Sequence, residues 1–154
     1  MYNRILVPLD GSELAECSLE HVKEVAVGCH VPEVVLLAIV EPANDSLPWS
    51  WGGVAGAQTQ ADRDKSEEKS ATDYLKKIAD RLSKEGMNII TCVQAGRAAD
   101  AILDYANQNG VDLIIMATHG RGGETRWDFG KVADRVIRTS SVPVLMASPK
   151  GCRI

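Results

Sequence analysis

A short, unbroken apolar run from Leu113 to Ala117 is the feature that most constrains the fold of this chain. The run has no polar alternation, so a strand built from it must be covered on both faces, as in a parallel sheet between two layers of helices. It stops at Thr118-His119, and three of the next four residues are glycine. Glycines beyond the carboxyl end of such a strand let backbone N–H groups approach an anion closely, at the edge where these sheets bind ligands.

Apolar runs and helical patterns alternate along the rest of the chain. Strands are predicted at 4–9, 33–40, 88–94, 113–117 and 141–147, and helices at 12–28, 61–84, 96–110 and 128–139. This alternation predicts one α/β domain over residues 1–154, with a doubly wound, five-stranded parallel sheet sandwiched by helices. Pro143 cannot donate to a ladder and favours an edge position for the last strand. The flatter hydrophobicity of 88–94 favours an edge as well, although sequence order alone leaves the strand order open.

Helical spacing predicts which side chains face the core. The inner face of the first helix includes Cys17 and His21, whereas His30 is placed on the surface. In the last helix, Val132, Val136 and Ile137 are expected to point inward. The charge-dense helix at 61–84 keeps one apolar stripe, formed by Ala71, Leu75, Ile78, Ala79 and Leu82.

The four cysteines, at positions 17, 29, 92 and 152, lie far apart and form neither a CxxC pair nor a Cys/His metal-ligand spacing. We therefore expect buried free thiols and no metal site, with only the tail residue Cys152 exposed. This reading assumes a reducing compartment.

The composition and charge of the chain limit the classes of partner that we expect. The formal net charge is -4, both signs are scattered, and no basic stripe is present, so neither nucleic acid nor an acidic membrane surface is an expected partner. No apolar run approaches the ~20 residues that a membrane span needs, and no secretion signal is recognisable. Small molecules or unknown protein partners in the cytoplasm are expected.

A long loop is predicted at residues 41–60, where prolines and glycines alternate with polar residues and with Trp49 and Trp51. Loops of this length without secondary structure are usually functional or mobile. The two indoles either cover a ligand or partner, or rest on the nearest apolar surface.

No catalytic set can be named. The P-loop pattern is absent, and only Gly11 stands where a G-x-G-x-x-G motif would follow the first strand. The third strand ends in Gln94-Ala95-Gly96, without the acceptor aspartate of a response regulator. Beyond Asp10 and His119 no acid/base pair converges.

If the first strand is central, its end lies beside the end of the fourth, which brings Asp10 opposite Thr118-His119-Gly120. Asp10 can cap the following helix or accept hydrogen bonds from a ligand, and the two roles are compatible. His119 can contact a phosphate through a ring nitrogen or orient its own loop by a hydrogen bond.

Several segments resemble the universal stress protein family, and together they span essentially the whole chain: 5–12 (ILVPLDGS), 35–40 (VLLAIV), 93–96 (VQAG), 117–123 (ATHGRGG) and 142–145 (VPVL). The resemblance implies an adenine nucleotide alpha hydrolase-like sheet in strand order 3-2-1-4-5. It also implies a homodimer formed by antiparallel contact of the last strand, here Val142–Met146.

Members of this family that bind ATP carry a glycine, two residues, a second glycine, nine residues, a third glycine and then Ser or Thr. This chain has Ala117, Gly120 and Gly130 at the glycine positions and Lys131 in place of the hydroxyl residue. The alanine adds only a methyl group. Lys131 removes a neutral hydrogen bond to phosphate, but its ammonium group can supply a charge-assisted one or occupy the phosphate space.

The resemblance implies an ATP-binding regulatory protein of the stress response, with or without Mg²⁺ and with at most weak ATP hydrolysis. The alternative is a dimeric interaction protein of the same fold whose phosphate site is degenerate. The residues implied to hold adenine and ribose are Pro8, Leu9, Asp10 and Ile39. Those implied to hold the phosphates are Gly120, Arg121, Gly130 and Val132, and Met116, Ala117, His119 and Lys131 complete the predicted nucleotide site.

Overall fold

The computed structural model describes residues 1–42, 60–119 and 130–148. Within them a five-stranded parallel sheet has the order β3-β2-β1-β4-β5. The strands are β1 (Arg4–Pro8), β2 (Glu33–Val40), β3 (Ile89–Ala95), β4 (Leu113–Ala117) and β5 (Val144–Ala147). The predicted fold class and strand order are confirmed, and β3 and β5 form the two edges as expected.

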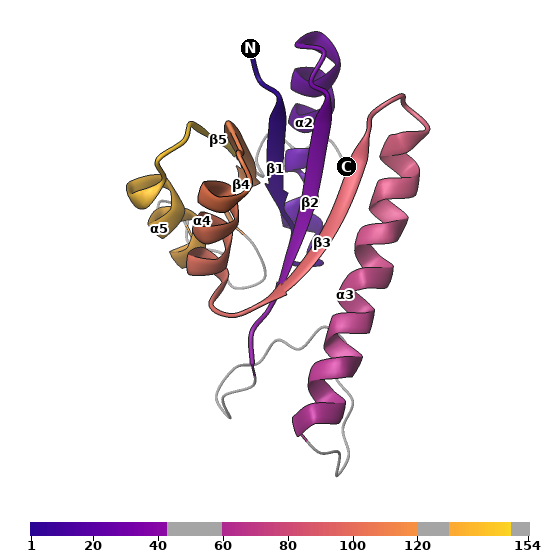
Figure 1. Cartoon of the computed structure of the whole chain (residues 1–154), viewed down its shortest axis with the longest axis vertical. Helices are drawn as coiled ribbons and strands as arrows, with labels where there is room; N and C mark the ends of the chain where they lie inside the picture. The colour runs from indigo at the N-terminus through magenta and orange to yellow at the C-terminus, as the bar shows by residue number, and fades with distance from the viewer. Residues whose placement is uncertain (43–59, 120–129, 149–154) are drawn as a thin grey trace.

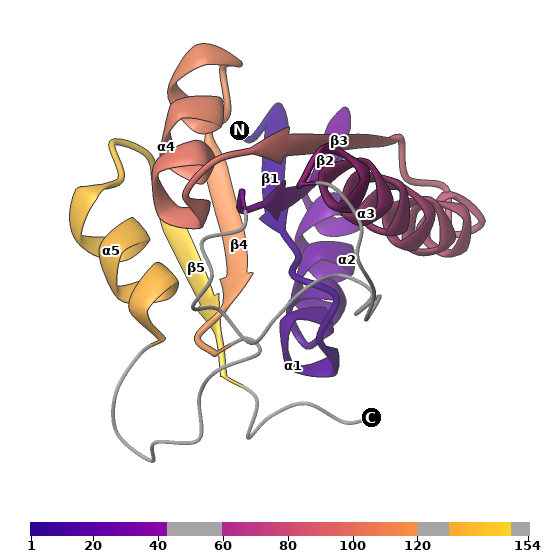
Figure 2. The same cartoon turned by 90° about the horizontal axis from the view of Figure 1, so that it is seen from below.

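Helices cover both faces of this sheet. They are α1 (Glu13–Glu16), α2 (Ser18–Gly28), α3 (Gln60–Ser83), α4 (Ala98–Gln108) and α5 (Lys131–Thr139). Figures 1 and 2 show α2 and α3 on one face, with α4 and α5 on the other. No helix in the described part of the chain is long and apolar enough to cross a membrane.

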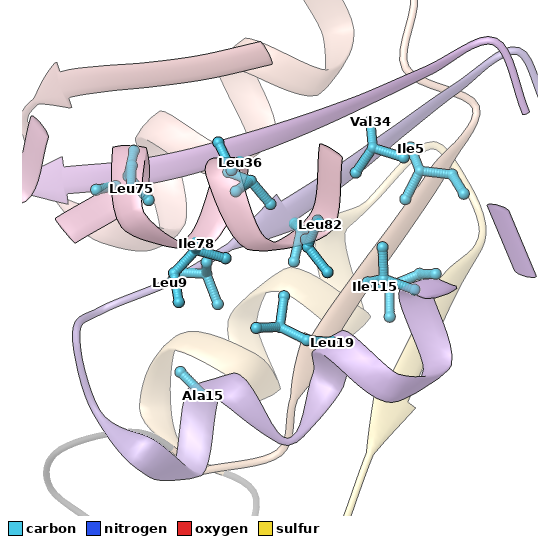
Figure 3. Close-up of a cluster of buried hydrophobic side chains, with 14 of the residues drawn as sticks. Ile5, Leu9, Ala15, Leu19, Val34, Leu36, Leu75, Ile78, Leu82 and Ile115 are labelled. Atoms are coloured by element: carbon cyan, nitrogen blue, oxygen red, sulfur yellow. The ribbon is translucent and has the colours of Figure 1, made fainter. Parts of the chain in front are cut away.

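The central strand β1 supplies side chains to both layers. Ile5 and Val7 belong to the core cluster under α2 and α3, whereas Leu6 belongs to the cluster under α4 and α5, and all three are fully buried. Figure 3 shows the first cluster, in which Leu75 and Leu82 of α3 point toward the sheet. Burial of successive residues on opposite faces explains why the strand sequences show no polar alternation.

The predicted first helix is interrupted at Cys17, which separates α1 from α2. The Ser18 hydroxyl donates to the carbonyl oxygen of Ala15 at 2.8 Å, and the N–H of Cys17 donates to Leu14 O at 3.3 Å. Local bonds of this kind compete with the regular helical ladder, and hydrophobic spacing does not reveal them.

The last strand is shorter than predicted and begins at Val144. The Ser140 hydroxyl donates to Val142 O and accepts from Val142 N–H, which forms a turn at 140–142. Pro143 follows that turn and has no N–H to donate. Its carbonyl oxygen accepts from the N–H of Ile114 at 3.0 Å, and the strand begins at the next residue, Val144.

Two of the predicted inward side chains face solvent. His21 is exposed on α2, where Leu19 and Val22 are buried instead, and Ile137 on α5 is 41% exposed. The stripe predicted on α3 is buried at all five positions. The two errors concern single residues at the margin of an apolar face, where spacing alone does not resolve orientation.

The expectation of buried free thiols is wrong. Cys17 is buried but belongs to a disulfide bond. Cys29 and Cys92 are free, yet Cys29 is exposed and Cys92 is only half-buried. The fourth cysteine, the tail residue at 152, lies outside the described residues.

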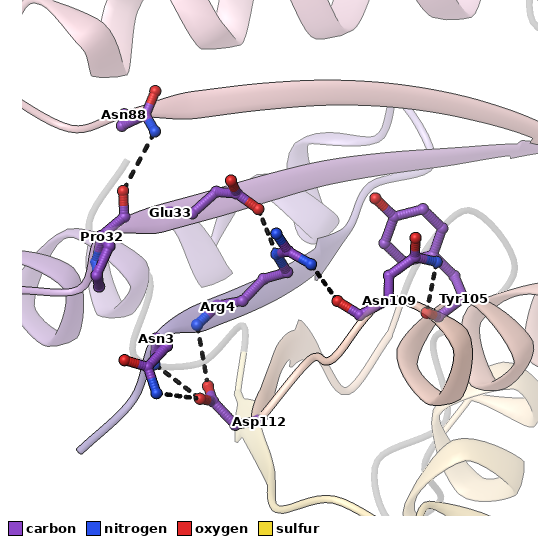
Figure 4. Close-up of polar contacts among 8 residues, drawn as sticks. All are labelled: Asn3, Arg4, Pro32, Glu33, Asn88, Tyr105, Asn109 and Asp112. Carbon is purple, nitrogen blue, oxygen red and sulfur yellow. Dashed lines mark hydrogen bonds and ion pairs between the residues drawn. The ribbon is translucent and has the colours of Figure 1, made fainter.

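A polar network fastens the amino-terminal ends of the strands (Figure 4). The Asp112 carboxylate accepts hydrogen bonds from the backbone N–H of Asn3 at 2.7 Å and of Arg4 at 3.2 Å. The Arg4 guanidinium forms an ion pair with Glu33 of β2 and donates to the carbonyl oxygen of Asn109 after α4. These contacts join β1, β2 and the turn before β4.

We expect Asp112→Ala to lower the free energy of unfolding by about 1 kcal/mol, because two backbone N–H groups lose a charged acceptor. Urea denaturation followed by circular dichroism measures this. Asp104→Ala is the matched control, since Asp104 is exposed on α4. Equal loss in the two variants would contradict the role assigned to Asp112.

Candidate functional site

The carboxyl ends of β1 and β4 lie at the same edge of the sheet. The two strands pair in parallel, with Ile5 opposite Leu113 and Leu6 opposite Ile114. In open parallel sheets ligands bind beyond the carboxyl ends of the strands, at the point where the strand order reverses. That point lies here between β1 and β4, since the chain winds outward from them in opposite directions.

Asp10 follows β1 and holds the turn that starts α1. Its carboxylate oxygen Oδ1 accepts from the N–H of Ser12 at 2.9 Å and from the Ser12 hydroxyl. The Ser12 hydroxyl oxygen in turn accepts from the N–H of Ala15 at 3.1 Å, so Ser12 is the N-cap. The direct capping role considered for Asp10 is therefore wrong, because its carboxylate supports the residue that caps. Gly11 between them has φ 80°, a conformation that glycine adopts readily.

The other residues predicted for the adenine end are close to this turn in the sheet. The N–H of Leu9 donates to Leu37 O at 2.9 Å and extends the ladder with β2 by one residue past Pro8. Leu9 is buried, whereas Pro8 is half-buried. Ile39 is half-buried near the end of β2. The ends of β1 and β2 thus offer backbone and apolar surface beside the Asp10 turn.

The peptide groups of Thr118 join three elements. Its N–H donates to Ala147 O of β5, and its carbonyl oxygen accepts from the N–H of Gly130, each at 2.9 Å. Met116 and Ala117 before it are buried. A Cβ on Gly130 would lie 3.3 Å from Thr118 O, which explains why glycine suits the position. The Gly130 N–H is consequently occupied within the protein.

His119 has one ring nitrogen engaged and one unpaired. Nδ1 lies 3.0 Å from the Thr118 hydroxyl oxygen, so the orienting hydrogen bond considered for this histidine is present. Nε2 is buried and has no hydrogen-bond partner among the residues that the structure describes. Buried polar atoms without a partner are uncommon in proteins. Among the described residues it is the buried side-chain polar atom whose hydrogen-bond partner the fold does not supply.

The start of α5 completes this end of the site. Gly130 is its N-cap and makes no side-chain capping bond, so the first-turn N–H groups have no intrahelical acceptor and carry the positive end of the helix dipole. The Lys131 side chain is exposed, and Val132 is half-buried against the core cluster under α4 and α5. Gly120 and Arg121 fall outside the described residues, as do Trp49 and Trp51.

Sequence reasoning missed a polar cluster that links α3 to this edge. The Tyr74 hydroxyl donates to Glu16 Oε1 at 3.0 Å, and Arg81 forms an ion pair with the same carboxylate at 3.6 Å. Burial raises the pKa of Tyr74 strongly, and the negative charges of Glu16 and Asp10 raise it further. Tyr74 directly precedes Leu75 of the buried stripe. No sequence motif distinguishes Tyr74 from other residues at the border of a buried helix face.

A cavity of about 190 Å³ lies beside this region, at the carboxyl ends of β2 and β3. It is lined by Val40, Pro42, Asp64, Glu68, Val93, Gln94 and Ala95. Its two ionisable side chains are acidic and would repel a phosphate group. This cavity therefore does not suit a phosphate group.

A parallel α/β sandwich whose strand order reverses between β1 and β4 belongs to the broad class of doubly wound domains. The sequence profile of the universal stress protein family matches residues 1–148. The chain belongs to this family. It is 30% identical, over 98% of both chains, to universal stress protein MJ0577 of Methanocaldococcus jannaschii.

Solved structures agree with this assignment. The structure of MJ0577 superposes with a TM-score of 0.77 over 96% of each chain at 26% identity. UspA of Lactobacillus plantarum gives 0.80 at 22% identity over 95% of this chain and 97% of its own. A universal stress protein solved in complex with cAMP gives 0.68 at 19% identity (96% and 98%), and an Arabidopsis thaliana member solved with AMP bound gives 0.65 at 12% (95% and 91%). The last three show the shared fold.

We expect Gly130→Ala to lower the free energy of unfolding by about 1 kcal/mol, because the added methyl group crowds Thr118 O and strains the bond between the two residues. Gly28→Ala is the matched control, since a Cβ there meets nothing within 4 Å and alanine is favoured in a helix. Thermal and urea denaturation compare the two. A neutral Gly130→Ala would mean that the junction relaxes freely.

Tyr74→Phe should change how stability depends on pH. The folded-state pKa of Tyr74 is raised, so the unfolded chain ionises first, at about pH 10. The stabilising contribution is complete below that pH and is lost as the pH rises further. At pH 7 the variant is less stable by about 1 kcal/mol through the lost hydrogen bond, and this difference shrinks above about pH 10. The midpoints of urea denaturation, measured for the wild type and the variant across this pH range, test the prediction, with Tyr2→Phe as control. A constant difference would contradict the assignment.

Proposed function

We propose that this chain is an ATP-binding regulatory protein of the stress response, with the nucleotide held at the carboxyl ends of β1, β2 and β4. The observation that carries the proposal is the amino-terminal end of α5, which the bond from Gly130 N–H to Thr118 O holds at this edge. Nε2 of His119, next to Thr118, has no hydrogen-bond partner among the described residues. An imidazole N–H and a helix N-terminus both favour a phosphate group. The relatives solved with cAMP and with AMP support an adenine nucleotide as the ligand class.

The two ends of the site suggest how the ligand is oriented. The base and ribose lie toward Pro8, Leu9, Asp10 and Ile39, where a carboxylate and backbone groups can accept from ribose hydroxyls or an exocyclic amine. The phosphates lie toward the β4–α5 end, and Gly120 and Arg121 are assigned there by the resemblance. The described residues contain no group of three or more potential metal ligands. Any Mg²⁺ would be held mainly by the phosphate oxygens and water, as is usual for this ion at phosphate sites.

Lys131 replaces the missing hydroxyl residue in this proposal. Its side chain is exposed at the first position of α5, so its ammonium group is free to reach the outer phosphates as a point charge. Gly130 contributes by positioning, since its N–H is bonded to Thr118 O. Met116, Ala117 and Val132 form the apolar support of the phosphate end.

Regulation is proposed rather than turnover. The Thr118 hydroxyl lies 3.0 Å from His119 Nδ1, but no described residue bonds Nε2 to orient the imidazole as a base. Hydrolysis of ATP is at most weak. The proposed working form is a cytoplasmic homodimer joined through Val142–Met146. In support, β5 is an edge strand with half-buried apolar side chains at Val144, Leu145 and Met146.

The second candidate function is a dimeric interaction protein of the same fold that binds no nucleotide. Two observations favour it: the Gly130 N–H is already bonded to Thr118 O, and a lysine replaces the hydroxyl residue next to it. Two of the phosphate donors implied by the resemblance would then be missing.

Isothermal titration calorimetry with ATP, AMP and cAMP tests the proposal. We expect saturable binding, and His119→Ala should weaken it by about tenfold through loss of one phosphate contact. His21→Ala is the matched control, because His21 is exposed on α2 away from the site. No saturable binding at millimolar nucleotide with Mg²⁺ would refute the proposal. If Lys131→Ser then binds ATP, the interaction protein becomes the preferred function.

A further inference from the structure

Within the part of the chain that the structure describes, the strand β3 lacks the sequence features that usually protect an edge strand. Its seven residues, Ile89–Ala95, include no proline and no charged side chain. Natural proteins commonly prevent edge pairing with lysine, proline, bulges or very short strands. The opposite edge strand, β5, has only four residues and follows Pro143. The β5 edge is therefore better protected against pairing with another strand than the β3 edge.

The hydrogen-bond register shows which backbone groups of β3 point outward. The N–H of Val34 donates to Asn88 O, and the N–H of Gly96 donates to Val40 O. Because strand residues alternate between inward and outward bonding, Ile90, Cys92 and Gln94 bond to β2. The outward residues are Ile89, Thr91, Val93 and Ala95. Their outward N–H and C=O groups have no partner in residues 1–42, 60–119 and 130–148.

Side-chain exposure also marks this edge. Ile90 is 40% exposed, one of the few large hydrophobic side chains on the described surface with such exposure, and its strand neighbour Thr91 is exposed. α3 packs on the sheet face that carries Ile89 and Val93, and Figure 1 shows β3 at the margin of the sheet. β3 thus combines an exposed apolar side chain with outward backbone N–H and C=O groups that have no partner among the described residues.

We propose that β3 pairs antiparallel with β3 of a second copy of this chain, about a two-fold axis beside Cys92. In this register Ile89 lies opposite Ala95 of the second copy, and Thr91 lies opposite Val93. All four outward residues of each strand then form hydrogen-bonded pairs. Cys92 of one copy lies opposite Cys92 of the other in a non-hydrogen-bonded pair. Every residue of the strand is matched, and no pair contains a charge.

Self-pairing suits this edge better than pairing with an unrelated strand. The strand is self-complementary over its full length in a single register, as an interface about a two-fold axis requires. The Ile90 side chain lies opposite Gln94 of the second copy and loses part of its exposure. The pairing uses the edge opposite to Val142–Met146, so it does not depend on the nucleotide site or on the proposed β5 dimer.

Oxidative crosslinking of the purified protein tests this pairing directly. Opposed residues of a non-hydrogen-bonded pair have Cα atoms roughly 4.5 Å apart, within the range that a disulfide bond spans. Copper-phenanthroline oxidation and peptide mass spectrometry should therefore yield a Cys92–Cys92 link between two copies. Cys29 is an internal control, because it is free and more exposed than Cys92 and would dominate random collisions.

A charge-exchange experiment distinguishes two-copy pairing from other causes. Thr91→Lys and Thr91→Glu should each reduce the Cys92 link about tenfold, because like charges then meet across the axis. Mixing the two variants should restore the link, since opposite charges are within reach diagonally. Thr72→Lys, which adds the same charge on an exposed position of α3, should leave it unchanged. Links at Cys29 alone, or a Cys92 link that is indifferent to both charges, would overturn the proposal.

Discussion

The structure depends on one requirement, that an apolar parallel strand be covered on both faces. β1 satisfies it by pairing with β2 and β4 while its alternate side chains enter two separate core clusters. Once β1 is central and doubly covered, the helices must divide between the faces. The strand order then reverses beside β1, and the carboxyl ends of β1 and β4 are left adjacent at the edge where the site is proposed.

The candidate site is built mainly from contacts that hold its own parts in place. Asp10 supports Ser12, Thr118 joins β4 to β5 and α5, and the Thr118 hydroxyl engages His119. A ligand entering this edge would therefore meet groups whose positions are already fixed. Pre-organisation of this kind reduces the ordering that binding requires.

The fold was predictable from the sequence because strand periodicity and turn residues report backbone pairing directly. The hydrogen-bonded pairs that determine the geometry of the candidate site were not predictable from the sequence. Nothing in the sequence shows whether the Gly130 N–H donates to Thr118 or to a phosphate group. Tyr74 likewise resembles any residue at the border of a buried helix face. The errors at His21, Ile137 and the cysteines have the same origin, because the orientation and pairing of a single side chain depend on tertiary neighbours rather than on spacing.

The long helix α3 is packed unevenly along its length. Its buried stripe begins at Ala71, whereas residues 61–70 include no buried side chain. Because tertiary packing supplies most of a helix's stability in a protein, the first turns should open far more often than the last ones. Amide hydrogen exchange would then slow progressively from Gln60 to Ser83 within one continuous helix. The cavity at the ends of β2 and β3 would be bordered by the fast-exchanging part, through Asp64 and Glu68.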